Sequence, residues 1–249
     1  MNKKHDREIE NALRMLDRQK DIFKHENIVT IHHISESPMI EGYDYGFVLM
    51  DRCQNDLFNV IYQNPTYEDK CFYLRQIMNG ISFLHDNKIC HCDLKFENCL
   101  INSRNQVQLC DFGFAIIIPE AQDMDLGIQL SYRAHGTPEY AGPEMHKSNV
   151  KFVPSKHDVW SFGIMFFVMF MKKFPFYNKI RPIKVLDTEQ YSTNLRFWKV
   201  WKKRYKKRFM SFPLADDQMS FFNQCIQYRY QDRANIRDLF DHPWYNRVK

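Results

Sequence analysis

Several features are scarce in this chain of 249 residues, and each scarcity argues against a class of protein. The seven cysteines are odd in number and contain no CxxC pair, which argues against a disulfide framework and a zinc site. No repeat, low-complexity tract or Gly/Ser-rich linker divides the chain. The longest apolar run, 159–171, is shorter than the roughly 20 residues that cross a bilayer. We therefore expect reduced thiols, a buried core helix over 159–171 and no membrane span.

Glycine is also scarce, with eight residues and no GxGxxG pattern. Positive and negative charges are nearly balanced, with 35 Lys and Arg against 30 Asp and Glu. The net charge of +5 permits an acidic partner without requiring one. The chain starts with the charged stretch MNKKHDREIE, which does not fit a signal peptide. A hydrophobic fraction of 44% and a charged fraction of 26% are ordinary for a globular protein. We expect a cytoplasmic or nuclear protein.

The order of hydrophobic patterns predicts an α+β fold. Residues 6–20 have helical periodicity, and the β-rich runs 27–34 and 45–50 predict an antiparallel pair of strands. A long helix begins at Tyr67, with an apolar stripe of Leu74, Ile77, Met78, Ile81 and Leu84. Residues 106–110 predict a short strand, and the chain beyond residue 155 is mainly helical. A small β-containing part therefore precedes a larger helical part, with polar loops at their junction.

The stretch HCDLKFENCLI, residues 91–101, concentrates side chains suited to chemistry. Asp93 and Asn98 are five positions apart on a predicted loop, and Asp111 follows thirteen residues later beyond a short strand. Carboxylate and amide oxygens from two neighbouring loops suit a hard cation such as Mg²⁺. Lys95 supplies the positive charge that a transferring phosphoryl group needs. These residues point to phosphoryl transfer.

The chain resembles a eukaryotic protein kinase of the serine/threonine type. The catalytic-loop pattern of that family is matched by His91, Asp93, Leu94 and Asn98, and its Mg²⁺ motif by Asp111, Phe112 and Gly113. Three further stretches match in the right order: GTPEYAGPE at 136–144, DVWSFG at 158–163, and the segment around Arg233, which resembles the arginine that pairs with Glu144. Together the matches cover residues 8–245.

This resemblance implies a two-lobed protein-kinase-like fold for residues 1–249. Residues 1–52 would form a partial N-terminal lobe and hinge, and residues 53–249 the C-terminal lobe. The implied activity is ATP-dependent phosphorylation of a protein serine or threonine, with ATP and Mg²⁺ as cofactors and a protein substrate as partner. We expect a monomer.

Catalytic and metal roles follow from the resemblance residue by residue. Asp93 would accept or orient the proton of the substrate hydroxyl, and Lys95 would steady the γ-phosphate. Thr137 would help to fix both around a hydroxyl substrate. Asn98 and Asp111 would hold the Mg²⁺ ions that bridge the phosphates.

The stretch 47–58 resembles the fifth strand and hinge of the family, which bind adenine. Met50 would line the back of the adenine pocket, and Leu100 would pack under the ring. The backbone of Asp51 and Cys53 would bond the adenine edge, while Asp56 would reach the ribose. The hinge is one residue shorter than its commonest form, so the position assigned to Asp56 is open by one residue.

Three features depart from the family pattern. A Gly-rich loop and a strand lysine should precede the first helix, and neither is found. We interpret the chain as an N-terminally incomplete version of a complete kinase, and the alternative is a truncated, catalytically impaired pseudokinase that acts as a binding scaffold. Cys92 replaces an arginine, so we expect activity to depend little on phosphorylation of Ser131 or Tyr132. Gly142 replaces an alanine, a change that we expect to be tolerated.

Residues 197–210 form a basic stretch with aromatic side chains at helical spacing. We favour a surface helix whose aromatic side chains pack inward. Binding of nucleic acid or another acidic partner through this stretch is the weaker alternative.

Overall fold

The chain folds into two compact units, Met1–Pro119 and Glu120–Lys249. The computed structural model describes residues 24–36, 46–125, 127–129, 136–146, 151–175 and 214–247. Several predicted features lie outside the described residues: the helix over 6–20, Ser131, Tyr132 and the basic stretch 197–210. The chain divides into these units after Pro119. The predicted lobe boundary near residue 52 stays a prediction.

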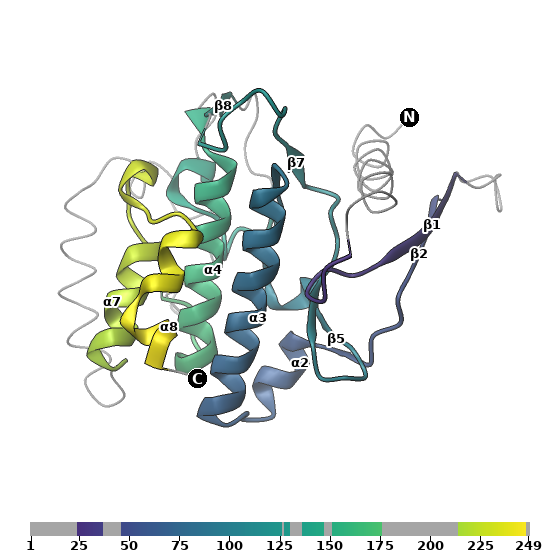
Figure 1. Cartoon of the computed structure of the whole chain (residues 1–249). Coiled ribbons are helices and arrows are strands. Elements are labelled where there is room, and N and C mark those ends of the chain that lie inside the picture. The colour runs from purple at the N-terminus through teal and green to yellow at the C-terminus, as the bar shows by residue number, and fades with distance from the viewer. Residues whose placement is uncertain are drawn as a thin grey trace. The chain divides into compact units, whose positions relative to one another are not determined.

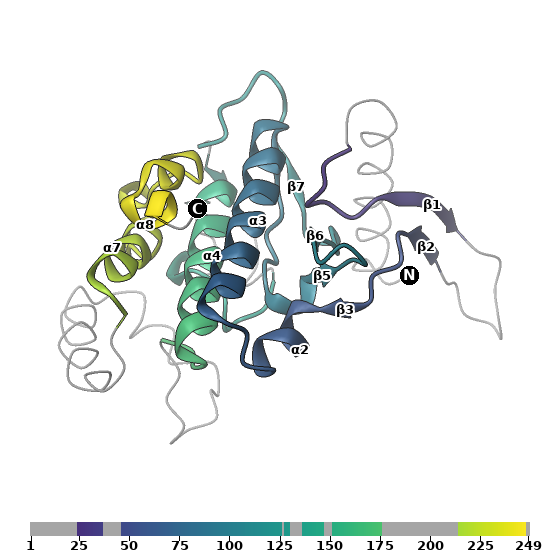
Figure 2. The ribbon, with the colours of Figure 1, turned by 60° about the horizontal axis from the view of Figure 1, so that its bottom comes forward.

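The described part of the first unit combines short antiparallel strands with two helices (Figure 1). In chain order it contains β1 (Ile31–Glu36), β2 (Gly46–Met50), β3 (Asn55–Asp56), α2 (Leu57–Tyr62), α3 (Tyr67–Asp86), β4 (Ile89–Cys90), β5 (Cys99–Ile101), β6 (Val107–Leu109) and β7 (Ile116–Ile117). β1 pairs with β2, β4 pairs with β7, and β5 lies between β3 and β6. Figure 2 shows β3 running directly into α2 beside β5 and β6. The α+β composition and the predicted pairing of two early strands are confirmed.

Helix α3 begins and packs as its sequence predicts. Thr66 caps it, because the Thr66 hydroxyl accepts from the Asp69 N–H at 3.1 Å and the Asp69 carboxylate accepts from the Thr66 N–H at 3.0 Å. All five residues of the predicted apolar stripe are buried. Gly80 lets the helix approach β6 closely, since a Cβ at this position would meet Leu109 Cδ1 at 2.9 Å. The helix therefore covers the sheet that carries residues 99–109.

The first strand starts later than predicted, at Ile31 instead of residue 27. Residues 27–29 leave the hairpin because they pair with β6. Leu109 N–H donates to the Asn27 carbonyl at 2.9 Å, and Val29 N–H donates to the Leu109 carbonyl at 3.0 Å. The buried Asn27 amide also donates to Gln76 Oε1 at 3.1 Å. This segment therefore ties the β1–β2 hairpin to the sheet beside the catalytic loop.

The second unit is mainly helical in its described part (Figure 1). It contains β8 (Ile128–Gln129), β9 (Lys151–Phe152), α4 (Pro154–Met171), α7 (Asp216–Cys225) and α8 (Pro243–Arg247), with 3-10 turns at Pro143–His146, Tyr230–Asp232 and Arg237–Asp241. Helix α4 is buried from Pro154 through Met169, which confirms the predicted core helix. The Phe166 ring lies 4.8 Å from those of Phe221 on α7 and Trp244 on α8. Among the described helices, none has the length and apolar character needed to span a membrane.

Candidate functional site

The loop between β4 and β5 places two polar side chains, those of Lys95 and Asn98, around the buried carboxylate of Asp93. Asp93 is 4% exposed, and its Oδ2 accepts from Lys95 Nζ at 2.9 Å. Asn98 Nδ2 donates to the backbone carbonyl of Asp93 at 2.9 Å and to its carboxylate at 3.2 Å. The Lys95 ammonium and the Asn98 amide thus hold the Asp93 carboxylate in place. A carboxylate that accepts a proton from a substrate must be held in this way.

His91 connects this loop to the end of β6. Its Nδ1 accepts from the backbone N–H of Asp93 at 3.3 Å, so the ring proton lies on Nε2. Nε2 can then donate to the backbone carbonyl of Cys110, 2.9 Å away, which only accepts. The N–H of the same cysteine donates to the Asn98 carbonyl at 3.0 Å. Both backbone groups of Cys110 are therefore held by the loop, which fixes the start of the Asp111 segment beside Asn98.

Asn98 and Asp111 present oxygen atoms suited to a hard cation. Because the Asn98 amide nitrogen donates to Asp93, the amide oxygen Oδ1 must face away from Asp93, and it accepts no hydrogen bond from a described residue. Asp111 is exposed, and one of its oxygens accepts from the Gly113 N–H at 3.3 Å. One amide oxygen and one carboxylate oxygen belong to the ligand types that Mg²⁺ prefers, together with phosphate and water oxygens.

Two residues of this region have left-handed backbone conformations. Cys92 has φ 62° and Asp111 has φ 59°, a region that non-glycine residues adopt infrequently. The Cys92 side chain is completely buried. The turn at Cys92 directs the neighbouring Asp93 toward Lys95 and Asn98, so the loop keeps its shape with a cysteine at this position.

The thiols around the site are in their neutral form. Burial, aided by the charge of Asp111, raises the pKa of Cys110 to about 12. Burial likewise raises the pKa of Cys99 well above its ordinary value. All seven cysteines belong to the described residues, and each is a free thiol. Six of these cysteines are buried, and Cys53 is half-buried.

In the predicted hinge, the two backbone groups that would bind adenine form no hydrogen bond with a described residue. Asp51 N–H donates to the Thr30 carbonyl at 3.0 Å, and His32 Nε2 lies 2.7 Å from the Asp51 carboxylate. These contacts hold Asp51 on the β1 side, while its carbonyl oxygen accepts no hydrogen bond from a described residue. The N–H of Cys53 likewise donates to no described residue. One acceptor and one donor two residues apart match the edge of an adenine ring.

The other predicted adenosine contacts lie on the same unit. Asp56 pairs with Leu100 across β3 and β5, so the two side chains share a face of the sheet. Asp56 also caps α2, because its two carboxylate oxygens accept from the backbone N–H and side-chain amide of Asn59 at 2.8 and 2.9 Å. If Asp56 binds the ribose, its carboxylate must do so while it also caps α2. Met50 ends β2 and is 43% exposed.

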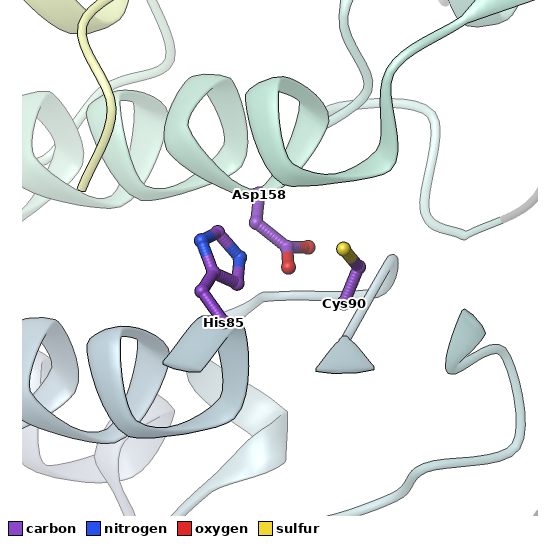
Figure 3. Close-up of side chains that lie close together, drawn as sticks. All are labelled: His85, Cys90 and Asp158. Atoms are coloured by element: carbon purple, nitrogen blue, oxygen red, sulfur yellow. The ribbon is translucent and has the colours of Figure 1, made fainter. Parts of the chain in front are cut away.

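A second group of ligand-type side chains lies at the end of α3. His85 and Cys90 place their ligand atoms within 4.8 Å of each other in the first unit (Figure 3). Asp158, also drawn there, belongs to α4 of the second unit. Structural zinc sites use four protein ligands and catalytic sites three. Two ligands from the first unit do not amount to a metal site.

Comparison with known sequences identifies the family. The sequence model of the protein kinase domain matches residues 1–245. The chain belongs to the protein kinase domain family. Its α+β fold is therefore protein-kinase-like, as the catalytic-loop and Mg²⁺ motifs predicted.

The relatives carry names of serine/threonine kinases. A protein named serine/threonine-protein kinase tousled-like 1 from Caenorhabditis elegans is 30% identical over 244 residues, which are 93% of this chain and 24% of that protein. Serine/threonine-protein kinase dkf-2 from Caenorhabditis briggsae is 30% identical over 215 residues, or 83% of this chain and 16% of that protein. The chain thus spans about a quarter or less of the length of these relatives.

In the second unit, Glu144 forms the predicted pair with Arg233. Arg233 donates to both carboxylate oxygens of Glu144 at 2.6 Å, and both residues are buried. Burial alone would raise the pKa of Glu144, but the charge of Arg233 and its hydrogen bonds outweigh burial and hold the pKa below 4.5. Arg233 also lies 4.8 Å over the Trp160 ring. Thr137 lies at the start of this segment, and its predicted role toward Asp93 stays a prediction.

The sequence did not predict a half-buried polar contact beneath the hinge. The Cys53 thiol donates to Gln108 Oε1 at 3.4 Å, and Gln108 is 7% exposed. Gln108 lies on β6, opposite Leu100 in the register. No motif marks this residue, because its only signal is a polar side chain in a short apolar strand.

Proposed function

We propose that this chain is the catalytic domain of a serine/threonine protein kinase, which transfers the γ-phosphoryl group of ATP to a hydroxyl of a protein substrate. The observation that carries the proposal is the arrangement of Asp93, Lys95 and Asn98 beside Asp111. An anchored carboxylate, an ammonium group and two oxygen ligands lie on two segments joined by the backbone of Cys110. Phosphoryl transfer uses such groups to orient the attacking hydroxyl and to hold Mg²⁺ on the phosphates.

Each side chain has a distinct part in the reaction. Asp93 orients the substrate hydroxyl and takes its proton as the oxygen attacks the γ-phosphorus, while the bond to the ADP oxygen breaks. Lys95, whose ammonium already contacts Asp93, places positive charge beside the transferring group. Asn98 Oδ1 and the Asp111 carboxylate would hold Mg²⁺, which when bound neutralises charge on the phosphates. The carbonyl of Asp51 and the N–H of Cys53 would bind the adenine edge.

A kinase of this type acts on a protein serine or threonine, and the names of the relatives support that substrate class. The D-L-K order around Lys95 favours serine or threonine over tyrosine. A monomeric state and a cytoplasmic or nuclear location stay predictions from the sequence.

The test is a phosphoryl-transfer assay with ATP, Mg²⁺ and a mixture of casein, histone and myelin basic protein, followed by phosphoamino-acid analysis. We expect phosphoserine or phosphothreonine from the wild type. Asp93→Asn should lower kcat by about 10²–10⁴-fold, because it removes the group that accepts the proton. The matched control is Glu97→Gln, which removes an exposed acid from the same loop and should retain activity.

Transfer that survives in Asp93→Asn would contradict the proposed role of Asp93. A wild-type protein that binds ATP without transferring phosphate would contradict the kinase activity and favour a pseudokinase scaffold.

A further inference from the structure

Among the described residues, one half-buried side-chain contact joins the hinge to the sheet of β3, β5 and β6. The thiol of Cys53 reaches Gln108 Oε1 at 3.4 Å. The next residue, Gln54, is joined to the sheet through its backbone, because its N–H donates to the Ile101 carbonyl at 2.8 Å. The Cys53–Gln108 contact is thus the side-chain link between the predicted adenine-binding backbone and β6.

Gln108 lies beside the predicted floor of the adenine site. In the antiparallel sheet, Asp56 is opposite Leu100, and Leu100 is opposite Gln108. Residues opposite one another lie on the same face with Cβ atoms about 4.5–5.5 Å apart. One row across the sheet therefore contains the residue predicted near the ribose, the residue predicted under the adenine ring, and Gln108.

The chemistry of the pair favours a persistent contact. Burial, followed by the charge of Asp51, raises the pKa of Cys53, so the thiol keeps the proton that it donates. Gln108 is more than nine-tenths buried, and among the described residues the Cys53 thiol is the hydrogen-bonding partner of its side-chain amide. Loss of the thiol would leave a buried amide oxygen unsatisfied, which is more costly than loss of an exposed contact.

We propose that Gln108 is a positioning residue for nucleotide binding: it holds Cys53 through its thiol and so fixes the Cys53 N–H that would meet the adenine edge. This inference rests on the proposed function. Gln108 needs no contact with the nucleotide in this role. Its effect falls on the affinity for the adenosine part of ATP and spares the transfer step at Asp93.

The test is a double-mutant cycle with the dissociation constant of ADP, measured by calorimetry without Mg²⁺, as the readout. Gln108→Leu and Cys53→Ala should each weaken ADP binding by about two- to tenfold, the range expected for one hydrogen bond. The double variant should be no weaker than either single variant, because both remove the same contact. Cys53→Ser keeps a donor and should restore most of the affinity lost in Cys53→Ala.

The matched control is Gln106→Leu, which removes a glutamine side chain just before β6. Gln106 Nε2 donates to the exposed carboxylate of Glu26 at 2.9 Å, and Gln106 Oε1 accepts from Asn102 Nδ2 at 3.1 Å, so its side-chain hydrogen bonds go to residues outside the hinge. We expect its ADP affinity to equal that of the wild type. In the transfer assay, Gln108→Leu should raise KM for ATP by the same factor while kcat changes less than twofold.

Unchanged ADP affinity in both single variants would overturn the inference, and so would effects that add in the double variant. These results differ from failure of the proposed function, in which the wild type itself binds no ADP. A melting temperature for each variant separates lost affinity from lost folding. A variant that is folded at the assay temperature and still binds as tightly as the wild type contradicts the role of Gln108.

Discussion

Arg233 forms a buried ion pair with Glu144, and this pair contributes to the stability of the second unit. Besides Glu144, its guanidinium donates to the carbonyls of Gln227 at 2.8 Å and Lys156 at 3.1 Å. Removing one partner of a buried ion pair leaves the other charge uncompensated. We expect Arg233→Met to lower the free energy of unfolding by about 3–5 kcal/mol, measured by urea denaturation at pH 7.

The control for this prediction is an ion pair in the same unit whose arginine is exposed. Arg247 lies 2.9 Å from Asp217, and its side chain is 60% exposed. Arg247→Met should cost about 0–1 kcal/mol, because water and salt screen exposed pairs. Equal losses in the two variants would show that burial does not set the strength of the Arg233 pair.

The same pair makes stability depend on pH. The pKa of Glu144 is lower in the folded chain than its ordinary value of 4.5, so the ionised form is favoured by folding. This stability is present above about pH 4.5 and is lost as the pH falls through the lowered pKa. We expect the difference in unfolding free energy between wild type and Glu144→Gln to shrink as the pH falls below 4.5. A difference that is constant from pH 7 to pH 3 would contradict the prediction.

At the scale of elements, the contact between α4 and α7 depends on a residue without a side chain. A Cβ at Gly163 would lie 2.6 Å from Cys225 Cβ and 2.9 Å from Ile226 Cδ1. The first of these atoms is fixed to the backbone, so the helices must separate. Gly163→Ala should lower the free energy of unfolding by about 1–3 kcal/mol, as overpacking does.

The sign of that change is decisive. Replacing glycine by alanine inside a helix gains up to about 1 kcal/mol from helix propensity alone. A net loss of stability therefore isolates the close approach of α4 and α7, and thermal unfolding of the two proteins measures it. A stabilised Gly163→Ala variant would show that the helices can move apart at little cost.

Elements with strong periodicity were predictable from the sequence, and elements that depend on distant partners were not. The apolar stripe of α3 and the apolar run of α4 predict buried helices because burial follows the helical repeat. Residues 27–29 have the composition of a strand of the hairpin, yet they pair with β6, which lies about 80 residues away in the sequence. That choice depends on the Asn27 amide finding Gln76 on α3, which local pattern does not reveal.

The candidate site follows the same division. The spacing of Asp93, Asn98 and Asp111 predicts that they lie together, and the backbone of Cys110 joins their two segments in the structure. The position of Gln108 could not be predicted, since a polar residue in an alternating strand predicts exposure, whereas its side chain is buried under the hinge. Contacts that position a site are set by the packing around it and leave weak marks in one sequence.

For the whole molecule, binding of nucleotide and folding are linked. A ligand that binds only the folded chain stabilises it by about 2.7 kcal/mol when its concentration is 100 times the dissociation constant. All the residues predicted to bind adenine and Mg²⁺ lie in the first unit. We therefore expect ATP to raise the melting temperature, and ATP with Mg²⁺ to raise it further, because Mg²⁺ adds contacts through Asn98 and Asp111.

The Asp111→Asn variant tests how much of the rise in melting temperature comes from binding of Mg²⁺. Asparagine tolerates the left-handed backbone that Asp111 adopts at φ 59°, so the loop should keep its shape. The loss of one carboxylate charge should abolish most of the Mg²⁺-dependent part of the shift, while the shift with ATP and EDTA stays as in the wild type, since the hinge contacts are intact. Glu97→Gln removes an exposed acid near the site and should keep both parts. A Mg²⁺-dependent shift that survives in Asp111→Asn would mean that the metal is held elsewhere, because an amide oxygen is a weaker ligand for Mg²⁺ than a carboxylate.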